Sequence, residues 1–148
     1  MTKFIPKPGQ VDFTNIRYCP VVNCLVRYRG KILMVKRSAE MDLYPNYWDG
    51  VAGFLDDDQS VEDKVKEEIL EELYIDADQI ESIKRGNVLI HESKKYQKTW
   101  IVFPILADVK TNKFELDYEA QDAKWLDPTD AKKLDLAPGV DRVLGEFF

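Results

Sequence analysis

Cysteine and histidine are scarce in this sequence of 148 residues. There are two cysteines, Cys19 and Cys24, and a single histidine, His91. A zinc site needs more ligands of these types, and a disulfide-rich scaffold needs more cysteines. We therefore expect both cysteines to be reduced, as in a cytoplasmic protein. We expect His91 to be an ordinary strand residue rather than a catalytic one.

Long apolar runs are absent as well. No segment approaches the roughly 20 apolar residues that a membrane-spanning helix needs. The first residues, MTKFIPKPGQVDFT, have no apolar core after their lysines, so they do not resemble a secretory signal. The sequence predicts one domain over residues 1–148, with an N-terminal arm at 1–16 and no membrane partner.

Positive charge is in deficit, but the deficit is local. The net charge is −6, and residues 56–76 hold ten acidic residues against two lysines. That segment therefore carries −8 and the rest of the chain +2. An acidic balance argues against a nucleic acid polymer as partner. It does not exclude a nucleotide, because a metal ion can screen the phosphates.

Apolar and β-branched runs predict the strands of the fold. A hairpin is expected around Arg29-Gly30, between strands at 21–28 and 31–37. Further strands are expected at 48–55, 86–92, 98–109 and 122–126.

The best-defined helix is expected to begin after Ser60. Ser60 can accept a hydrogen bond from a free N–H of the first turn, with Asp63 completing a capping box. An apolar stripe then follows helical spacing and is expected to pack on a sheet; it consists of Val61, Val65, Ile69 and Leu73, widened by Leu70. Short helices are expected from Pro128 and over 139–148. Together these elements predict an α/β fold with a mixed sheet.

Glu68, Glu71 and Glu72 lie on adjacent turns of this helix, although like charges at this spacing destabilise it. Oxygen ligands suit hard cations, so the three carboxylates can converge on Mg²⁺ or Mn²⁺. Such ions would screen a polyphosphate and activate a water molecule. Taken alone, the motif favours a solvated helix face, because charged helix faces are common.

The surrounding residues resemble the Nudix box. Its pattern is a glycine followed at fixed spacing by Glu, Arg-Glu, an aliphatic residue, Glu-Glu, glycine and a second aliphatic residue. Gly53 takes the first position of that pattern. The matching residues after it are Glu68, Ile69, Glu71, Glu72 and Ile75. The order of hairpin, loop, box, two strands and closing helix is similar to that of a Nudix domain over about residues 15–148.

The resemblance implies an α/β/α sandwich around a mixed sheet. It also implies a metal-dependent hydrolase of a pyrophosphate bond in a nucleoside diphosphate linked to another moiety. It assigns the metal ligands to Glu68, Glu71 and Glu72, with the backbone of Gly53 near the metal. In this fold Glu119 lies in a region that can supply a further carboxylate to metal or water.

Three positions depart from the box. Gln59 stands in place of Glu and Glu67 in place of Arg, a pair thought to brace the helix in the family. We hypothesise that Gln59 and Glu67 keep a weaker brace through a hydrogen bond. Alternatively, each is a plain surface residue. Tyr74 replaces a glycine that serves a left-handed exit from the helix. Either tyrosine adopts that conformation at a cost of about 1 kcal/mol, or the helix ends differently.

Candidate substrate-binding residues flank the box. Lys36 and Arg37 end the second predicted strand and can meet phosphate oxygens. Tyr44 is a candidate for stacking on a base, and Trp48 can do the same or belong to the core.

The sequence favours a pyrophosphohydrolase acting on a small nucleotide-like substrate. The alternative is a Nudix-fold nucleotide-binding or regulatory domain that has lost turnover, which Gln59 and Glu67 favour. The same scaffold also hosts an isopentenyl diphosphate isomerase, but the catalytic cysteine of that enzyme and its context are not evident in this sequence. The sequence does not decide whether the protein forms a homodimer, because no stretch marks an interface.

Overall fold

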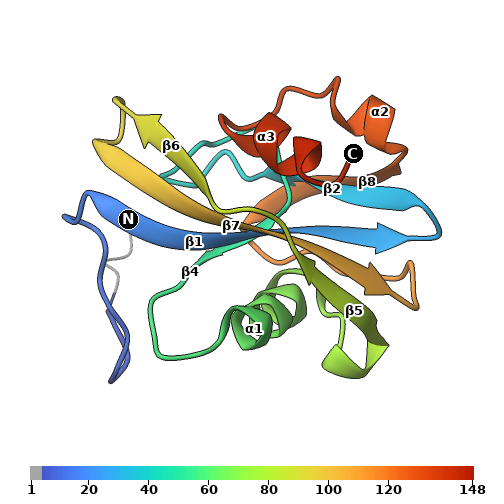
Figure 1. Cartoon of the computed structure of the whole chain (residues 1–148), viewed down its shortest axis with the longest axis horizontal. Helices are drawn as coiled ribbons and strands as arrows, with labels where there is room; N and C mark the ends of the chain where they lie inside the picture. The colour runs from blue at the N-terminus through green and yellow to red at the C-terminus, as the bar shows by residue number, and fades with distance from the viewer. Residues whose placement is uncertain (1–4) are drawn as a thin grey trace.

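The computed structural model describes residues 5–148; residues 1–4 of the predicted arm lie outside the described part. Eight strands form one mixed sheet, with helix α1 on one face and the short helices α2 and α3 on the other (Figure 1). This arrangement confirms the predicted α/β/α sandwich. Among residues 5–148, no helix is long and apolar enough to cross a membrane.

Two long strands, β1 (Tyr18–Tyr28) and β7 (Lys98–Val109), pair in parallel at the centre of the sheet. Every other strand pairing is antiparallel. β1 pairs with both β2 and β4, and β7 with both β5 and β6, while β3 and β8 flank β2. The shorter strands are β2 (Lys31–Arg37), β3 (Trp48–Asp49), β4 (Val51–Phe54), β5 (Ile80–Arg85), β6 (Leu89–Ser93) and β8 (Ala120–Leu126).

The predicted strand at 48–55 is two strands with different partners. β3 pairs with β2, and β4 pairs with β1. Gly50 lies between them, where a Cβ would come within 2.6 Å of both the Asn23 Oδ1 and the Cys24 carbonyl oxygen. Only glycine permits this close approach, which lets the chain pass from one partner strand to the other.

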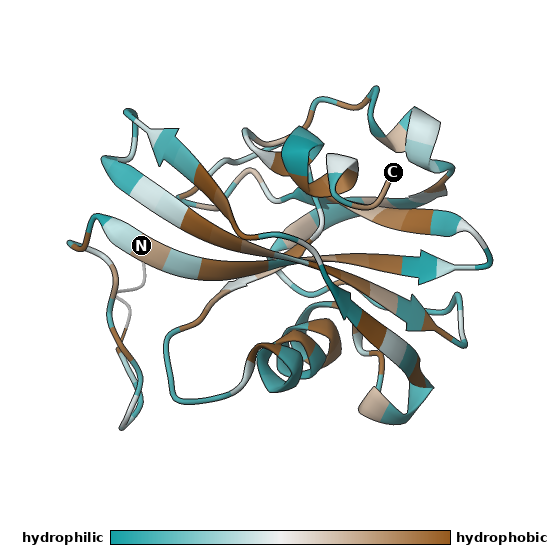
Figure 2. Cartoon of the chain, viewed as in Figure 1, coloured by the Kyte–Doolittle hydropathy of each residue, from teal (hydrophilic) through white to brown (hydrophobic). Residues whose placement is uncertain are grey.

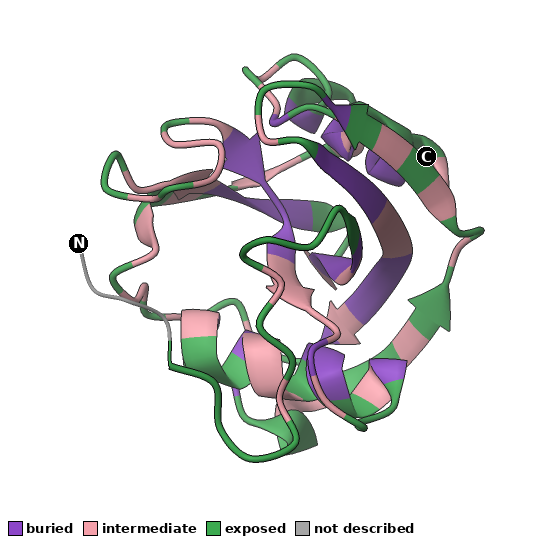
Figure 3. Ribbon diagram, turned by 90° about the vertical axis from the view of Figure 1, so that its left-hand side faces the viewer, coloured by how far each residue is buried: buried purple, intermediate pink, exposed green. Residues whose placement is uncertain are grey.

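Two apolar cores lie on opposite faces of the sheet, and its central strands are buried (Figures 2 and 3). The first packs α1 (Val61–Leu73) on the sheet, and the second packs α2 (Pro128–Ala131) and α3 (Val140–Gly145). Cys19 and Cys24 are buried and unpaired, as predicted.

Helix α1 has the predicted cap and most of the predicted apolar stripe. Val61, Val65, Ile69 and Leu73 are buried, and Ser60 Oγ accepts a hydrogen bond of 3.1 Å from Asp63 N. The prediction that Leu70 widens the buried stripe was wrong, because its side chain is 46% exposed.

Tyr74 follows the last residue of helix α1 and adopts the left-handed conformation (φ 56°, ψ 36°). This is the first of the two alternatives that the sequence left open. The N–H of Tyr74 donates to the Leu70 carbonyl, so the turn satisfies one of the helix's last carbonyls.

The described part of the N-terminal arm, residues 5–16, contains no strand but is tied to the domain. Lys98, which is 7% exposed, donates to the carbonyl oxygens of Phe13, Thr14 and Ile16. Val11 N donates to the Asp56 carbonyl at 2.5 Å. The arm therefore packs beside the loop that leads into α1.

Candidate active site

Glu68 packs directly against the glycine that precedes helix α1. A Cβ on Gly53 would clash with the carboxyl group of Glu68. Gly53 lies in β4 opposite Val22 of β1, so the sheet fixes its position. The absence of a side chain at position 53 is what allows a glutamate of α1 to approach the backbone of the sheet.

Glu72 and Glu119 complete a cluster of carboxylates on this side of the sheet. Glu72 Oε2 is buried and has no hydrogen-bond partner among the described residues. Glu119 comes from the loop before β8, where its N–H donates to Asp117 Oδ1 and its carbonyl accepts from Ser38 N at 2.8 Å. Glu71 lies on the exposed edge of the helix.

The electrostatics of the cluster are those of like charges held out of water. Burial, followed by the charges of Glu71 and Glu119, raises the pKa of Glu68 to about 8. Burial beside Glu119 and Glu68 places the pKa of Glu72 well above its usual value. Burial also raises the pKa values of Glu71 and Glu119. A bound cation would relieve this repulsion.

The carboxylates fit a divalent cation in chemistry but do not form a closed cage. Their oxygens are the ligands that Mg²⁺ and Mn²⁺ prefer, and Glu72 offers a buried oxygen without a partner. Within residues 5–148, however, no three His, Cys, Asp or Glu side chains are grouped closely enough to enclose a metal ion. The predicted convergence of Glu68, Glu71 and Glu72 would therefore need side-chain rotation on binding.

Comparison with known proteins identifies the family. The model of the NUDIX domain family matches residues 17–147. The chain belongs to the Nudix family.

Relatives of known name agree with this assignment. An uncharacterized Nudix hydrolase of Bacillus subtilis, YvcI, is 25% identical over 126 residues, which is 84% of this chain and 75% of the relative. A MutT NUDIX hydrolase from Burkholderia pseudomallei has a TM-score of 0.76 at 20% identity, covering 89% of this chain and 99% of that chain. A C. elegans Ap4A hydrolase has a TM-score of 0.69 at 20% identity, covering 87% and 94%. These structural likenesses show the fold, and membership of the family classes the chain as a Nudix-type pyrophosphohydrolase.

The Nudix box is braced here by a residue that sequence reasoning missed. Within residues 5–148, no hydrogen bond joins Gln59 to Glu67: Gln59 is exposed, and its backbone N–H donates to Asp57 Oδ1 at 3.1 Å. Glu67 Oε2 instead lies 3.1 Å from Lys64 Nζ. The available signal was the spacing, since Lys64 precedes Glu67 by three residues on the same helix face.

Arg37 and Lys36 differ in their relation to the Nudix carboxylates. Arg37 Nε donates to the Leu43 carbonyl at 2.9 Å, and its guanidinium lies 3.8 Å from the buried Asp49. Arg37 is also close enough to Glu119 to oppose the rise in the pKa of that carboxyl. Lys36 ends the same strand and makes no ion pair within the described chain.

The two aromatic candidates both pack at the core under α2 and α3. Of the two roles that the sequence left open for Trp48, the structure supports the core: it is 8% exposed and packs under α2 and α3, with Lys124 over its ring. Tyr44 packs against that same core, on the face opposite α1. Its hydroxyl accepts from Trp100 Nε1 at 2.9 Å, and its N–H donates to the Tyr96 hydroxyl.

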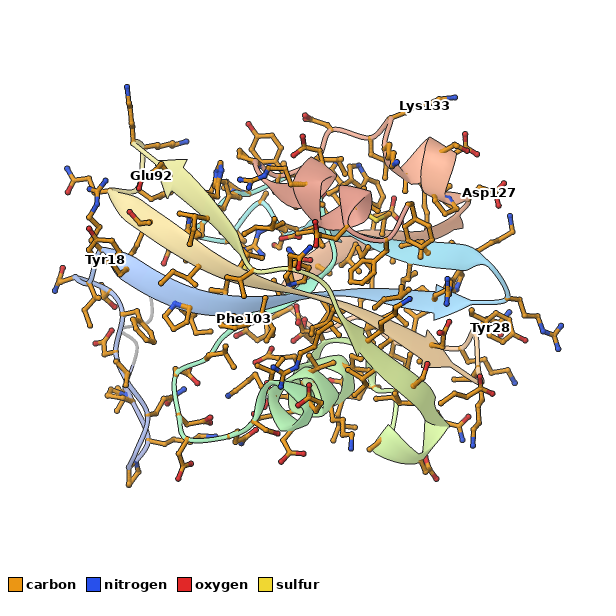
Figure 4. The ribbon with its side chains drawn as sticks, viewed as in Figure 1. Tyr18, Tyr28, Glu92, Phe103, Asp127 and Lys133 are labelled. Carbon is orange, nitrogen blue, oxygen red and sulfur yellow. The ribbon has the colours of Figure 1, made fainter. Side chains whose placement is uncertain are left out.

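Tyr44 does line a cavity of about 230 Å³, together with Tyr47, His91 and Tyr96. Glu92 at its rim marks the end of the sheet where Tyr18 also lies, opposite the end marked by Tyr28 (Figure 4). None of the Nudix glutamates lines this cavity. Tyr44 and the Nudix glutamates therefore do not line the same cavity. His91 is a strand residue, in β6, as predicted.

Replacing Gly53 with alanine is expected to lower the hydrolytic rate at least tenfold, because the added methyl group displaces the Glu68 carboxyl. Initial rates under saturating Mg²⁺ measure the effect. Gly145→Ala is the matched control, since a Cβ there meets nothing within 4 Å. Equal rates for both variants would show that the contact with Gly53 does not orient Glu68.

Proposed function

We propose that the protein is a divalent-metal-dependent hydrolase that cleaves a pyrophosphate bond in a nucleoside diphosphate-linked substrate. The observation that carries this proposal is the cluster of half-buried glutamates Glu68, Glu72 and Glu119, in which Glu68 packs against Gly53. A cluster of like-charged side chains with little access to water is costly to fold. That cost is understandable if a cation neutralises the cluster in the working protein.

We assign Glu68, Glu71 and Glu72 as ligands of Mg²⁺ or Mn²⁺, with the backbone of Gly53 beside them. When bound, such a cation withdraws charge from the phosphoryl oxygens and favours deprotonation of an attacking water molecule. Glu119 faces Glu72 from the loop before β8 and is suited to accept the proton of that water at its carboxylate.

On the substrate side, Arg37 is the better-placed cation of the predicted pair. Its charge reaches Glu119, and its side chain is already oriented by the Leu43 carbonyl and Asp49. We propose that Arg37 contacts a phosphate oxygen, with Lys36 adding charge from the same strand end. We further propose that the whole chain acts as one domain, with the arm packed beside the loop that leads into α1. Whether two copies form a homodimer is not part of this proposal.

Two observations favour the alternative of a nucleotide-binding or regulatory Nudix domain without turnover. The carboxylates of the described residues are not grouped closely enough to enclose an ion, and Glu67 adds a negative charge where the box has an arginine. This alternative predicts binding of a nucleoside diphosphate compound without its cleavage.

A substrate panel separates the two functions. The protein is incubated with Mg²⁺, Mn²⁺ or EDTA and with nucleoside triphosphates, ADP-ribose, dinucleoside polyphosphates and nucleotide sugars. Dinucleoside polyphosphates are included because one structural neighbour is an Ap4A hydrolase. We expect metal-dependent release of phosphate-bearing products from at least one class. Tight binding of a panel member without product in any metal would establish the alternative instead.

A further inference from the structure

Lys64 is a buried cation at the start of the helix face that carries the glutamates. It is 3% exposed, and its position is related to Glu67, Glu68 and Glu71 by three, four and seven residues. These spacings place all four side chains along one face of α1. A lysine is almost never this buried unless it is paired.

The ammonium group of Lys64 contacts three carboxylates from two segments. Its Nζ lies 3.1 Å from Asp56 Oδ1, 3.0 Å from Asp57 Oδ2 and 3.1 Å from Glu67 Oε2. Asp56 and Asp57 belong to the loop between β4 and α1, and Glu67 lies on the next turn of the helix. Lys64 therefore ties the helix to the loop that begins just after Gly53.

The same network extends to the N-terminal arm. The second carboxylate oxygen of Asp56 accepts a hydrogen bond of 2.7 Å from Gln10 Nε2, and its carbonyl accepts from Val11 N. One lysine thus organises the arm, the loop and the helix around the contact between Glu68 and Gly53. Its charge also offsets the negative charge at Glu68 and Glu71.

We propose that Lys64 is the positioning residue of the active site: by holding Asp56, Asp57 and Glu67, it keeps α1 against the β4–α1 loop so that Glu68 stays oriented on Gly53. The inference rests on the proposed metal-dependent function. It assigns to Lys64 the bracing task that the hypothesised bond between Gln59 and Glu67 does not perform.

The test compares the Mn²⁺ affinity of the wild type with that of Lys64→Met in the absence of substrate. Electron paramagnetic resonance of free Mn²⁺ measures the affinity. The two physical effects of the substitution have opposite signs. Loss of a positive charge alone would tighten cation binding. Loss of positioning would weaken it, and we expect a 10- to 100-fold weaker affinity with a similar fall in kcat.

A merely structural role predicts a different pattern. Lys64→Met would then lower Tm but leave Mn²⁺ affinity and kcat unchanged or improved at temperatures well below Tm, which would overturn the inference. The matched control is Glu62→Gln, which breaks an ion pair of 2.6 Å between the same helix and Arg85 on its outer side. We expect the control to leave Mn²⁺ affinity within twofold of the wild type.

A second set of variants tests the inference if Lys64→Met does not fold. Gln59→Glu with Glu67→Arg restores the box sequence but places two cations side by side, because Lys64 remains. We expect this double variant to bind Mn²⁺ more weakly than the wild type and the addition of Lys64→Ala to recover at least tenfold. Improvement by the double variant alone would contradict the inference.

The outcomes separate this inference from the proposed function. If the wild type cleaves no panel substrate but Lys64→Met weakens Mn²⁺ binding, positioning holds and the hydrolase function fails. If the wild type turns over and Lys64→Met keeps full Mn²⁺ affinity and kcat, the positioning role fails and the hydrolase stands.

Discussion

Glu72→Gln is expected to lower metal-dependent hydrolysis by at least about 100-fold, because it removes a ligand oxygen and not merely a supporting contact. The same substitution is expected to raise the Tm of the metal-free protein at pH 8. The Glu72 Oε2 atom is buried without a partner in the described structure, and burial with the charges of Glu119 and Glu68 raises the pKa of this carboxyl. A neutral amide of the same shape removes that unfavourable charge.

Initial rates and thermal melts of the metal-free protein measure the two effects. Glu81→Gln, on the exposed surface of β5, is the matched control and should change neither. The opposite signs are the useful part of this prediction. Loss of activity together with a lower Tm would indicate simple misfolding, and full activity would remove Glu72 from the site.

The second large effect is an inverted pH dependence of stability in the metal-free protein. The pKa of Glu68 is raised to about 8 in the folded state by burial and by the charges of Glu71 and Glu119. In the unfolded chain a glutamate titrates near its usual value, about 4.3. The stability that this raised pKa contributes is therefore fully present below about pH 4.3 and is lost as the pH rises through about 8.

We therefore expect the free energy of unfolding to fall by roughly a few kcal/mol between pH 5.5 and pH 8.5. Glu72 and Glu119, whose pKa values are also raised, act in the same direction. The opposing groups do not cancel this slope: the lowered pKa values of Asp57, Glu62 and Asp108 affect stability only at more acidic pH.

Urea unfolding in EDTA at several pH values measures the slope, and repetition in Mg²⁺ is the control. Metal binding requires ionised carboxylates, so Mg²⁺ should stabilise the protein most at the alkaline end. A metal-free protein that gains stability from pH 5.5 to 8.5 would show that the glutamates are charged and solvated throughout.

Local sequence signals predicted the elements that depend on short-range pattern. The strand at Lys31–Arg37 and the cap at Ser60 follow from turn residues and side-chain hydrogen bonds within a few residues. β5, with the sequence IESIKR, was missed because only Ile80 and Ile83 point toward the core. Such an edge strand has little apolar alternation to detect.

The sequence marked the candidate ligands but not the contacts that support them. The spacing of the box singled out Glu68 and Glu72, and the family resemblance added Glu119, whose carboxyl the structure places beside Glu72. The contacts of Lys64 depend on how the loop holding Asp56 and Asp57 folds back, which local pattern does not encode. The sequence left Trp48 open between stacking and core for a similar reason, since its burial depends on α2 and α3, far along the chain.

The central claim is that the carboxylates of α1 bind a divalent cation beside Gly53. The most direct measurement is an anomalous difference map from a crystal soaked in Mn²⁺. We predict a manganese peak bound by the carboxylates of Glu68 and Glu72, next to the backbone of Gly53. A map without manganese at this position, with both side chains turned toward solvent, would contradict the claim.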